Sequence, residues 1–193
     1  FIIVDDNGCA AGQAVIVPEP SPDITATFDP TNINCFGDAT GALTINANGG
    51  TPTLTYDWST PGNPSFSTNP IIQSLTAGTY TCNVSDATGC ITPFSHIITE
   101  SAILSASLNT VQMSSAGAND ASISVINISG GDGNYSYSWT GPSGPISNSN
   151  SAVINTLSWG TYSVTITDGL MCALILSDFI IDPLCGILIS DNV

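Results

Sequence analysis

The feature that most constrains the fold of this chain is an internal repeat with a period of about 80 residues. Residues 75–80 (LTAGTY) recur 82 positions later as residues 157–162 (LSWGTY). Residues 56–58 (YDW) recur 81 positions later as residues 137–139 (YSW). Further landmarks keep nearly the same spacing: Ile3, Asp5 and Cys9, then Val84, Asp86 and Cys90, then Ile166, Asp168 and Cys172. Repeats at this interval indicate an array of similar small domains, each with its own core.

The period divides the chain into four parts. We predict the C-terminal end of a preceding repeat with a Pro-rich linker in residues 1–22, complete repeats in 23–102 and 103–184, and a linker or the start of the next repeat in 185–193. The prolines in residues 18–22 (PEPSP) favour a stiff, extended connection, whereas the other junction has none. We therefore expect a segment of a longer array whose joints differ in stiffness.

Within one repeat, apolar residues alternate with polar ones in the manner of half-buried strands. Leu43 and Ile45 alternate with Thr44 and Asn46, which is the period of two expected of a strand with one face in a core. Glycine, proline and asparagine mark the turns between such segments. The expected strands lie near residues 23–28, 42–47, 54–59, 70–74, 79–85 and 91–98. Short strands at this density predict an all-β, two-sheet antiparallel sandwich.

A tyrosine near the start of one expected strand narrows the choice among sandwiches. Tyr80 stands two residues before the inward-facing Cys82, as in the tyrosine corner of immunoglobulin-like domains, where the hydroxyl bonds to nearby backbone. Trp58 is the expected core tryptophan of a facing strand. Tyr162 and Trp139 take the same places in the second repeat. We therefore predict tandem immunoglobulin-like β-sandwich repeats, with these two tyrosines and two tryptophans in structural roles.

The charge balance excludes several functions. The chain has 15 acidic residues, no Lys or Arg, and a formal charge of −15 at pH 7. Nucleic-acid binding and attraction to anionic membranes both depend on basic side chains, so neither nucleic-acid binding nor membrane insertion is expected. Phosphate-binding loops of the G-x-x-x-x-G-K-[ST] type also require lysine. The one histidine, His96, lies in an expected strand with no evident catalytic partner, so we do not expect an enzyme.

Four landmarks taken together resemble the SprB repeat. They are residues 49–50 (GG), 56–58 (YDW), 75–80 (LTAGTY) and 84–90 (VSDATGC). The second repeat departs from this pattern in residues 168–172 (DGLMC), which lack a glycine before the cysteine, and in Met113, which lies near the place expected for a counterpart of Cys35. Polycystic-kidney-type and other immunoglobulin-like modules share parts of the pattern. The resemblance implies a giant secreted adhesin of gliding bacteria, built as a filamentous array at the cell surface and used in adhesion or gliding motility.

The six cysteines favour an oxidising, extracellular setting, and their pairing has several solutions. The resemblance favours a bridge between Cys35 and Cys90 within the first repeat. A rival pairing joins Cys35 to Cys82 across the two sheets, and the simplest role of Cys82 is that of a small core residue. Cys172 and Cys185 are further candidates, although the departures in the second repeat argue against a bridge there.

Aspartates in equivalent turns offer a weak calcium hypothesis. These residues are Asp5, Asp6, Asp86 and Asp168. Carboxylate oxygens near the joints between domains are suitable Ca²⁺ ligands. Aspartate in a turn more often accepts hydrogen bonds from its own backbone, and no EF-hand spacing is present. We therefore expect no metal or other cofactor, with Ca²⁺ as the weaker alternative.

Two functions fit these observations. The first is a structural or adhesive segment of a long extracellular fibre, without chemistry, whose partners are neighbouring repeats of the same chain and other fibres in a self-associated filament. The alternative is a carbohydrate-binding accessory module of a secreted multidomain enzyme. Trp159 replaces Ala77 of the first repeat, and it is the aromatic residue expected to contact a neighbour or a surface polysaccharide.

Overall fold

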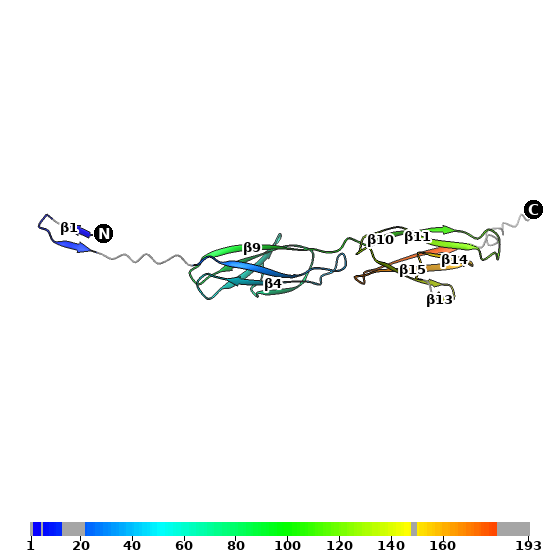
Figure 1. The fold of residues 1–193 in the computed structure, drawn as a ribbon, viewed down its shortest axis with the longest axis horizontal. Helices are drawn as coiled ribbons and strands as arrows, with labels where there is room; N and C mark the ends of the chain where they lie inside the picture. Colours follow the sequence, from blue (N-terminus) through cyan, green and yellow to red (C-terminus); the bar gives the residue numbers. More distant parts are fainter. Residues whose placement is uncertain (1, 5, 13–21, 148–149, 181–193) are drawn as a thin grey trace, which may run out of the picture.

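The computed structural model describes residues 2–4, 6–12, 22–147 and 150–180. Within these ranges the regular secondary structure is β-strand, arranged as two sandwiches that lie end to end, preceded in sequence by a short hairpin (Figure 1). None of the described residues forms a helix with the length and apolar character needed to cross a membrane.

The first sandwich consists of two antiparallel sheets. The three-stranded sheet has the order β3 (Thr25–Thr31), β4 (Gly41–Asn48) and β7 (Ile71–Leu75). The four-stranded sheet has the order β6 (Asn63–Ser67), β5 (Thr55–Thr60), β8 (Gly78–Ser85) and β9 (Ile91–Ile98). Because sequential strands switch between the sheets, the chain encloses one core between two faces.

The second sandwich repeats this topology strand for strand. Its three-stranded sheet contains β10 (Ser105–Val111), β11 (Ala121–Ser129) and β14 (Val153–Leu157). Its four-stranded sheet contains β13 (Gly144–Pro145), β12 (Tyr135–Gly141), β15 (Gly160–Asp168) and β16 (Ala173–Ile180). The predicted fold class, tandem immunoglobulin-like sandwiches, is confirmed. The strands lie inside the predicted ranges 23–102 and 103–184.

A third copy of one structural element stands at the beginning of the chain. Strands β1 (Ile2–Val4) and β2 (Ala10–Gly12) form a hairpin in which Val4 pairs with Ala10. Ser85 and Ile91, 81 positions later, pair in the same way between β8 and β9. The hairpin therefore has the register of the last hairpin of a complete repeat. The predicted linker in residues 13–21 lies outside the described residues.

The two tryptophans occupy the centres of the two cores. Trp58 and Trp139 are fully buried, in clusters that share the same arrangement of strands. The indole N–H of Trp58 donates to the carbonyl of Asn69 at 2.8 Å, and that of Trp139 donates to the carbonyl of Ser151 at 2.9 Å. Each ring therefore packs against apolar neighbours while its polar atom is satisfied.

The tyrosines close the end of each sandwich that leads into β8 or β15. The Tyr80 hydroxyl donates to the carbonyl of Thr76 at 3.0 Å, and the Tyr162 hydroxyl donates to the carbonyl of Ser158 at 3.2 Å. Both side chains are buried. The contact joins the strand to the crossover four residues upstream, which is the geometry of a tyrosine corner.

We expect Tyr80→Phe and Tyr162→Phe each to destabilise one repeat by roughly 1–2 kcal/mol, because a part-buried hydrogen bond between the hydroxyl and a backbone carbonyl is lost. Urea unfolding followed by the fluorescence of Trp58 or Trp139 measures each repeat. Equal losses from both repeats in either single variant would contradict a local role for the hydroxyl.

Cys82 lies in the first core and forms no bridge. It stands opposite Trp58 in the pairing of β5 with β8 and has no exposed surface. The predicted rival pairing of Cys35 with Cys82 is therefore wrong, because the Cys82 side chain points into the sandwich while Cys35 lies in a turn. Burial raises the pKa of the Cys82 thiol to about 11.

We expect Cys82 to resist alkylation in the folded chain, because the thiolate is the reactive form and the protein disfavours it. The raised pKa also predicts a stability contribution that is complete below about pH 9 and is lost as the pH rises towards 11. Maleimide labelling with and without urea tests this, and the exposed Cys90 is the internal control. Equal labelling rates for both cysteines in the folded chain would rule out the buried position.

Candidate functional site

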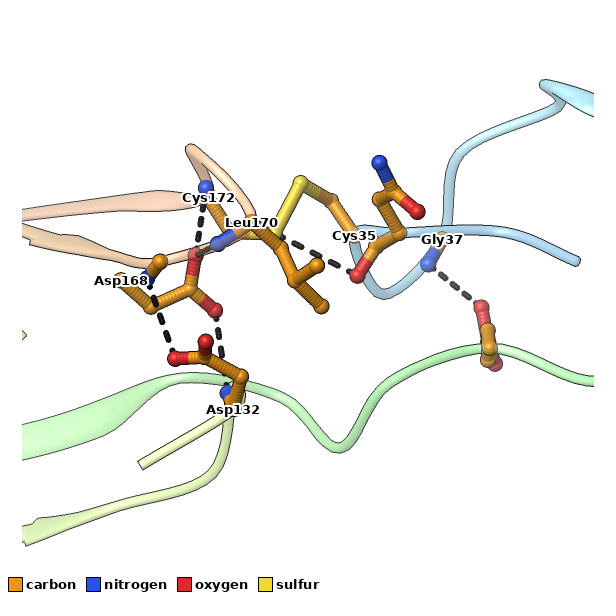
Figure 2. Close-up of a disulfide and its surroundings, with 9 residues drawn as sticks. Cys35, Gly37, Asp132, Asp168, Leu170 and Cys172 are labelled. Atoms are coloured by element: carbon orange, nitrogen blue, oxygen red, sulfur yellow. Dashed lines mark hydrogen bonds between the residues drawn. A yellow bond between two sulfur atoms is a disulfide. The ribbon is translucent and has the colours of Figure 1, made fainter. Parts of the chain in front are cut away.

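A disulfide bond joins the two sandwiches. Cys35 follows β3 in the first repeat, Cys172 precedes β16 in the second, and their sulfur atoms are bonded (Figure 2). The Cα atoms are 5.4 Å apart, although the residues are separated by 137 positions in the sequence. This Cα separation is ordinary for a disulfide. The bond makes the junction between the repeats the candidate functional site.

The predicted bridge between Cys35 and Cys90 is wrong. Cys35 lies beyond the end of β3, whereas the loop that holds Cys90 lies near the beginning of that strand, where a Cβ built on Gly50 would lie within 3.1 Å of both Ile24 and Asp86. A strand of seven residues is about 20 Å long, since each residue adds about 3.3 Å. The two cysteines therefore occupy opposite ends of one sandwich, and Cys35 meets the loop of the next repeat instead.

A buried aspartate shapes the loop that presents Cys172. One carboxylate oxygen of Asp168 accepts hydrogen bonds from the backbone N–H groups of Leu170, at 2.9 Å, and Cys172, at 2.8 Å. The N–H of Asp168 donates to the carbonyl of Cys172 at 3.0 Å. Asp168 is only 3% exposed. The carboxylate thus fixes the backbone on both sides of the turn that carries the cysteine.

The other oxygen of Asp168 connects this loop to a neighbouring turn. It accepts a hydrogen bond from the N–H of Asp132 at 3.3 Å, and the N–H of Gly169 donates back to the Asp132 carboxylate at 3.0 Å (Figure 2). Hydrogen bonds from Asn134 and Gly169 lower the pKa of the Asp132 carboxyl. The two turns therefore form one reciprocal network at the end of the second sandwich.

Two of the predicted calcium ligands, Asp86 and Asp168, accept backbone hydrogen bonds in the structure. Asp86 accepts hydrogen bonds from the N–H groups of Thr51, Thr88 and Cys90, as Asp168 does at the equivalent place. Asp6 is exposed, and Asp5 lies outside the described residues. No group of three or more His, Cys, Asp or Glu side chains suited to a metal occurs in the described part of the chain.

The peptide linker is attached to the first sandwich. The carboxylate of Glu100 accepts a hydrogen bond from the N–H of Gly37 at 2.7 Å, two residues beyond Cys35. The N–H of Ile33 donates to the carbonyl of Thr99 at 2.9 Å. Linker and cysteine turn are therefore held together on the side of the first repeat.

The same linker is attached to the second sandwich two residues later. The carbonyl of Ala102 accepts a hydrogen bond from the N–H of Gly131 at 2.9 Å. Gly130 has a φ of 83°, and a Cβ there would lie 1.9 Å from the carbonyl oxygen of Ile103, so the close contact requires glycine. Between Glu100 and Ala102, only Ser101 lacks such an attachment in this part of the structure.

An open groove of about 440 Å³ lies beside the disulfide. The apolar side chains of Phe36, Ile103 and Met171 are among its lining residues, and Met171 is 80% exposed. The groove is formed by both repeats, so its shape depends on the joint. Its lining residues are Cys35, Phe36, Asp38, Ile103, Leu104, Met171, Cys172, Ala173 and Leu174.

Two other predicted residues lie away from the joint. Trp159 is 61% exposed, at the turn between β14 and β15, and it does not line the groove. The ring of His96, in β9, lies 5.2 Å from that of Phe28 and so packs against a neighbouring aromatic side chain. Cys185 lies outside the described residues.

The structure identifies the residue of the second repeat that is equivalent to Cys35. The N–H of Asp38 donates to the carbonyl of Cys35, and the N–H of Ala118 donates to that of Ser115, so Ser115 is the residue equivalent to Cys35. Met113, which was expected near that position, is buried in the second core. The sequence signal that was missed is a difference between the two repeats. The second repeat has a cysteine in the loop before its last strand, Cys172 (a loop cysteine), but Ser115 in the turn where the first repeat has Cys35 (a turn cysteine). Cys172 therefore lacks a turn cysteine within its own repeat and bonds to that of the neighbouring repeat.

A family model for the SprB repeat matches residues 27–63 and 107–144, one segment in each sandwich. No curated protein matches the sequence.

Solved structures of multi-domain proteins show similarity at low identity. Three N-terminal domains of the highly immunogenic outer capsid protein of bacteriophage RB49 match at 20% identity, covering 82% of this chain and 59% of that one, with a TM-score of 0.48. The first eight immunoglobulin domains of a Down syndrome cell adhesion molecule match at 15% identity, covering 82% and 24%, with a TM-score of 0.43. The ectodomain of mouse nectin-like molecule 4 matches at 10% identity, covering 88% and 67%, with a TM-score of 0.41.

The matched segments begin in the first strand of each sandwich and end beside the strand that holds its core tryptophan. Each of the two immunoglobulin-like β-sandwiches therefore contains one segment that matches the SprB repeat.

Proposed function

We propose that this chain is a stiff, non-catalytic segment of a secreted fibre on the cell surface, which holds an adhesive or motility-related part of the protein at a distance from the cell. The single observation that carries this proposal is the disulfide between Cys35 and Cys172, which fixes one repeat on the next. SprB repeats occur in surface proteins of the adhesin type, and the disulfide is typical of an extracellular protein.

The joint has two covalent connections rather than one. A single peptide linker allows the second domain to swing in every direction, whereas two connections leave only bending about the line through both. The hydrogen bonds of Glu100 and Ala102 attach the linker to both domains and oppose that remaining motion. The arrangement therefore favours a fixed angle between repeats, which a spacer needs in order to keep its length.

The charge of the chain supports a fibre whose lateral contacts depend on salt. A net charge of −15 without a basic residue makes separate fibres repel each other. Screening shortens that repulsion, since the Debye length falls from about 30 Å at 0.01 M to about 8 Å at 0.15 M ionic strength. Self-association into thicker filaments is therefore proposed to increase with salt.

Small-angle X-ray scattering of residues 1–193 tests the stiff joint. We expect the oxidised chain to scatter as a single extended body, and the double variant Cys35→Ser/Cys172→Ser to show a broader distribution of distances between the two repeats. Cys90→Ser is the matched control, because it removes an exposed cysteine outside the joint. Identical scattering from the double variant and the control would overturn the proposal of a disulfide-stiffened spacer.

A further inference from the structure

The loop that holds Cys90 has the same structure as the loop that holds Cys172. The N–H of Asp86 donates to the carbonyl of Cys90 at 3.0 Å, and the N–H of Asp168 donates to that of Cys172 at 3.0 Å. The N–H of Cys90 donates to the Asp86 carboxylate at 3.0 Å, which corresponds to the bond of 2.8 Å in the second repeat. The first repeat therefore presents a cysteine in the backbone conformation that forms the disulfide in the second.

The neighbouring elements of the two loops also correspond. A Cβ on Gly50, whose φ is 63°, would lie 3.0 Å from the Cβ of Asp86, which is a tight contact. The N–H of Gly50 donates to the carbonyl of Pro22, just as that of Gly131 donates to Ala102. Pro22 and Ala102 are thus the same position in two linkers. The end of the first sandwich that carries Cys90 therefore has the same local structure as the end of the second sandwich that carries Cys172 and joins it to the preceding repeat.

Cys90 has no suitable partner among the described residues. Its side chain is exposed and accepts a hydrogen bond from the Thr88 hydroxyl at 3.6 Å. Cys35 is bonded to Cys172, and Cys82 is enclosed in the core. Cys9 belongs to a hairpin of the same register as β8–β9, so it is another loop cysteine rather than a turn cysteine.

We propose that Cys90 forms a second disulfide between repeats, with a cysteine in the turn equivalent to the Cys35 turn of the repeat that precedes residue 22. The expected partner is a cysteine in a turn that has a glycine two residues later. Cys35 stands in this relation to Gly37, whose φ is 80°. Linkage of Cys90 to Cys9, to Cys185 or to a second copy of the chain is an alternative outcome of the test.

The bond forms by oxidation of two thiols. Cys90 and the turn cysteine each lose one proton and one electron, and an S–S bond forms between them. A protein disulfide of the thiol oxidase class accepts both electrons and both protons and becomes a dithiol. Because this exchange proceeds through a thiolate, the exposure of Cys90 makes it accessible to the oxidant.

The inference rests on the proposed function, since it extends the stiff joint to the preceding repeat. The two can fail separately. If scattering shows a stiff joint between the two described sandwiches while Cys90 remains a thiol, the spacer stands and the second bridge does not exist.

Peptide mapping of the native full-length protein tests the second bridge. The protein is isolated without reductant, alkylated in denaturant and digested with proteases specific for acidic or aromatic residues, since it offers no tryptic site in residues 1–193. We expect Cys90 in a disulfide-linked peptide with a turn cysteine of the preceding repeat, and Cys82 alkylated as the internal control. Quantitative alkylation of Cys90, or its recovery linked to Cys9, Cys185 or another Cys90, would overturn the proposal.

Alkylation of two further proteins, the full-length Cys90→Ser variant and residues 1–193 alone, identifies the partner independently of the disulfide-linked peptide. In the full-length protein, Cys90→Ser should expose one newly alkylated thiol, and that thiol should lie in the turn of the preceding repeat. In residues 1–193 alone, Cys90 should be alkylated as completely as denatured Cys82. If Cys90→Ser releases no new thiol, the assigned partner is wrong.

Discussion

Reduction of the Cys35–Cys172 disulfide is expected to destabilise the pair of repeats by up to about 5 kcal/mol and to separate their unfolding transitions. The loop closed by the bond spans 137 residues, and cross-linking a loop of that length removes roughly this much free energy from the unfolded chain by the loop-entropy relation. Calorimetry of the oxidised chain and of Cys35→Ser/Cys172→Ser measures the effect. The figure of about 5 kcal/mol is an upper limit, because a repeat that unfolds alone frees only part of the closed loop.

The control for this prediction is Cys90→Ser. A bridge between Cys35 and Cys90, which the resemblance to the SprB repeat favoured, would have confined the effect of reduction to the first repeat. The observed pairing instead predicts that reduction lowers the stability of both repeats. Loss of stability from the first repeat alone, or a loss in Cys90→Ser equal to that of the double variant, would contradict the bond between repeats.

Asp168→Ala is expected to destabilise the second repeat by roughly 3–5 kcal/mol. Three backbone N–H groups, those of Asp132, Leu170 and Cys172, lose their acceptor, and each part-buried donor left unsatisfied costs about 1–3 kcal/mol. The same loop positions Cys172, so the fraction of chains that form the disulfide should also fall. Urea unfolding monitored by Trp139 fluorescence and non-reducing peptide mapping measure the two effects.

Asp86→Ala provides the matched variant for the first repeat. Asp86 accepts the equivalent hydrogen bonds in a loop that is not part of the observed disulfide. We expect a comparable loss of stability from the first repeat with no change in the Cys35–Cys172 bond. Asp168→Asn should be milder than Asp168→Ala, since one acceptor oxygen remains. Unchanged disulfide formation in Asp168→Ala would show that Cys172 does not depend on its loop.

Much of each sandwich could be predicted from the sequence because strands and cores depend on short-range patterns. Alternation in residues 42–47 indicated which face of β4 is buried, and the recurrence of Trp58 as Trp139 indicated two equivalent cores. The short strand β6 was not predicted, since Pro61, Gly62 and Pro64 give its segment the composition of a loop. The pairing of β6 with β5 therefore outweighs the preference of these residues for a loop conformation.

The repeat, the two cores and the tyrosine corners were determined by the sequence alone, because each depends on residues of one repeat and on periodic burial. The disulfide was decided only by the tertiary structure. Cys35 and Cys90 belong to one repeat and look like partners in sequence, yet the strands carry them to opposite ends of the sandwich. Which cysteine Cys35 meets depends on how the next domain is stacked against its turn, and that geometry arises from the contacts of residues 99–104 with both domains rather than from any local pattern.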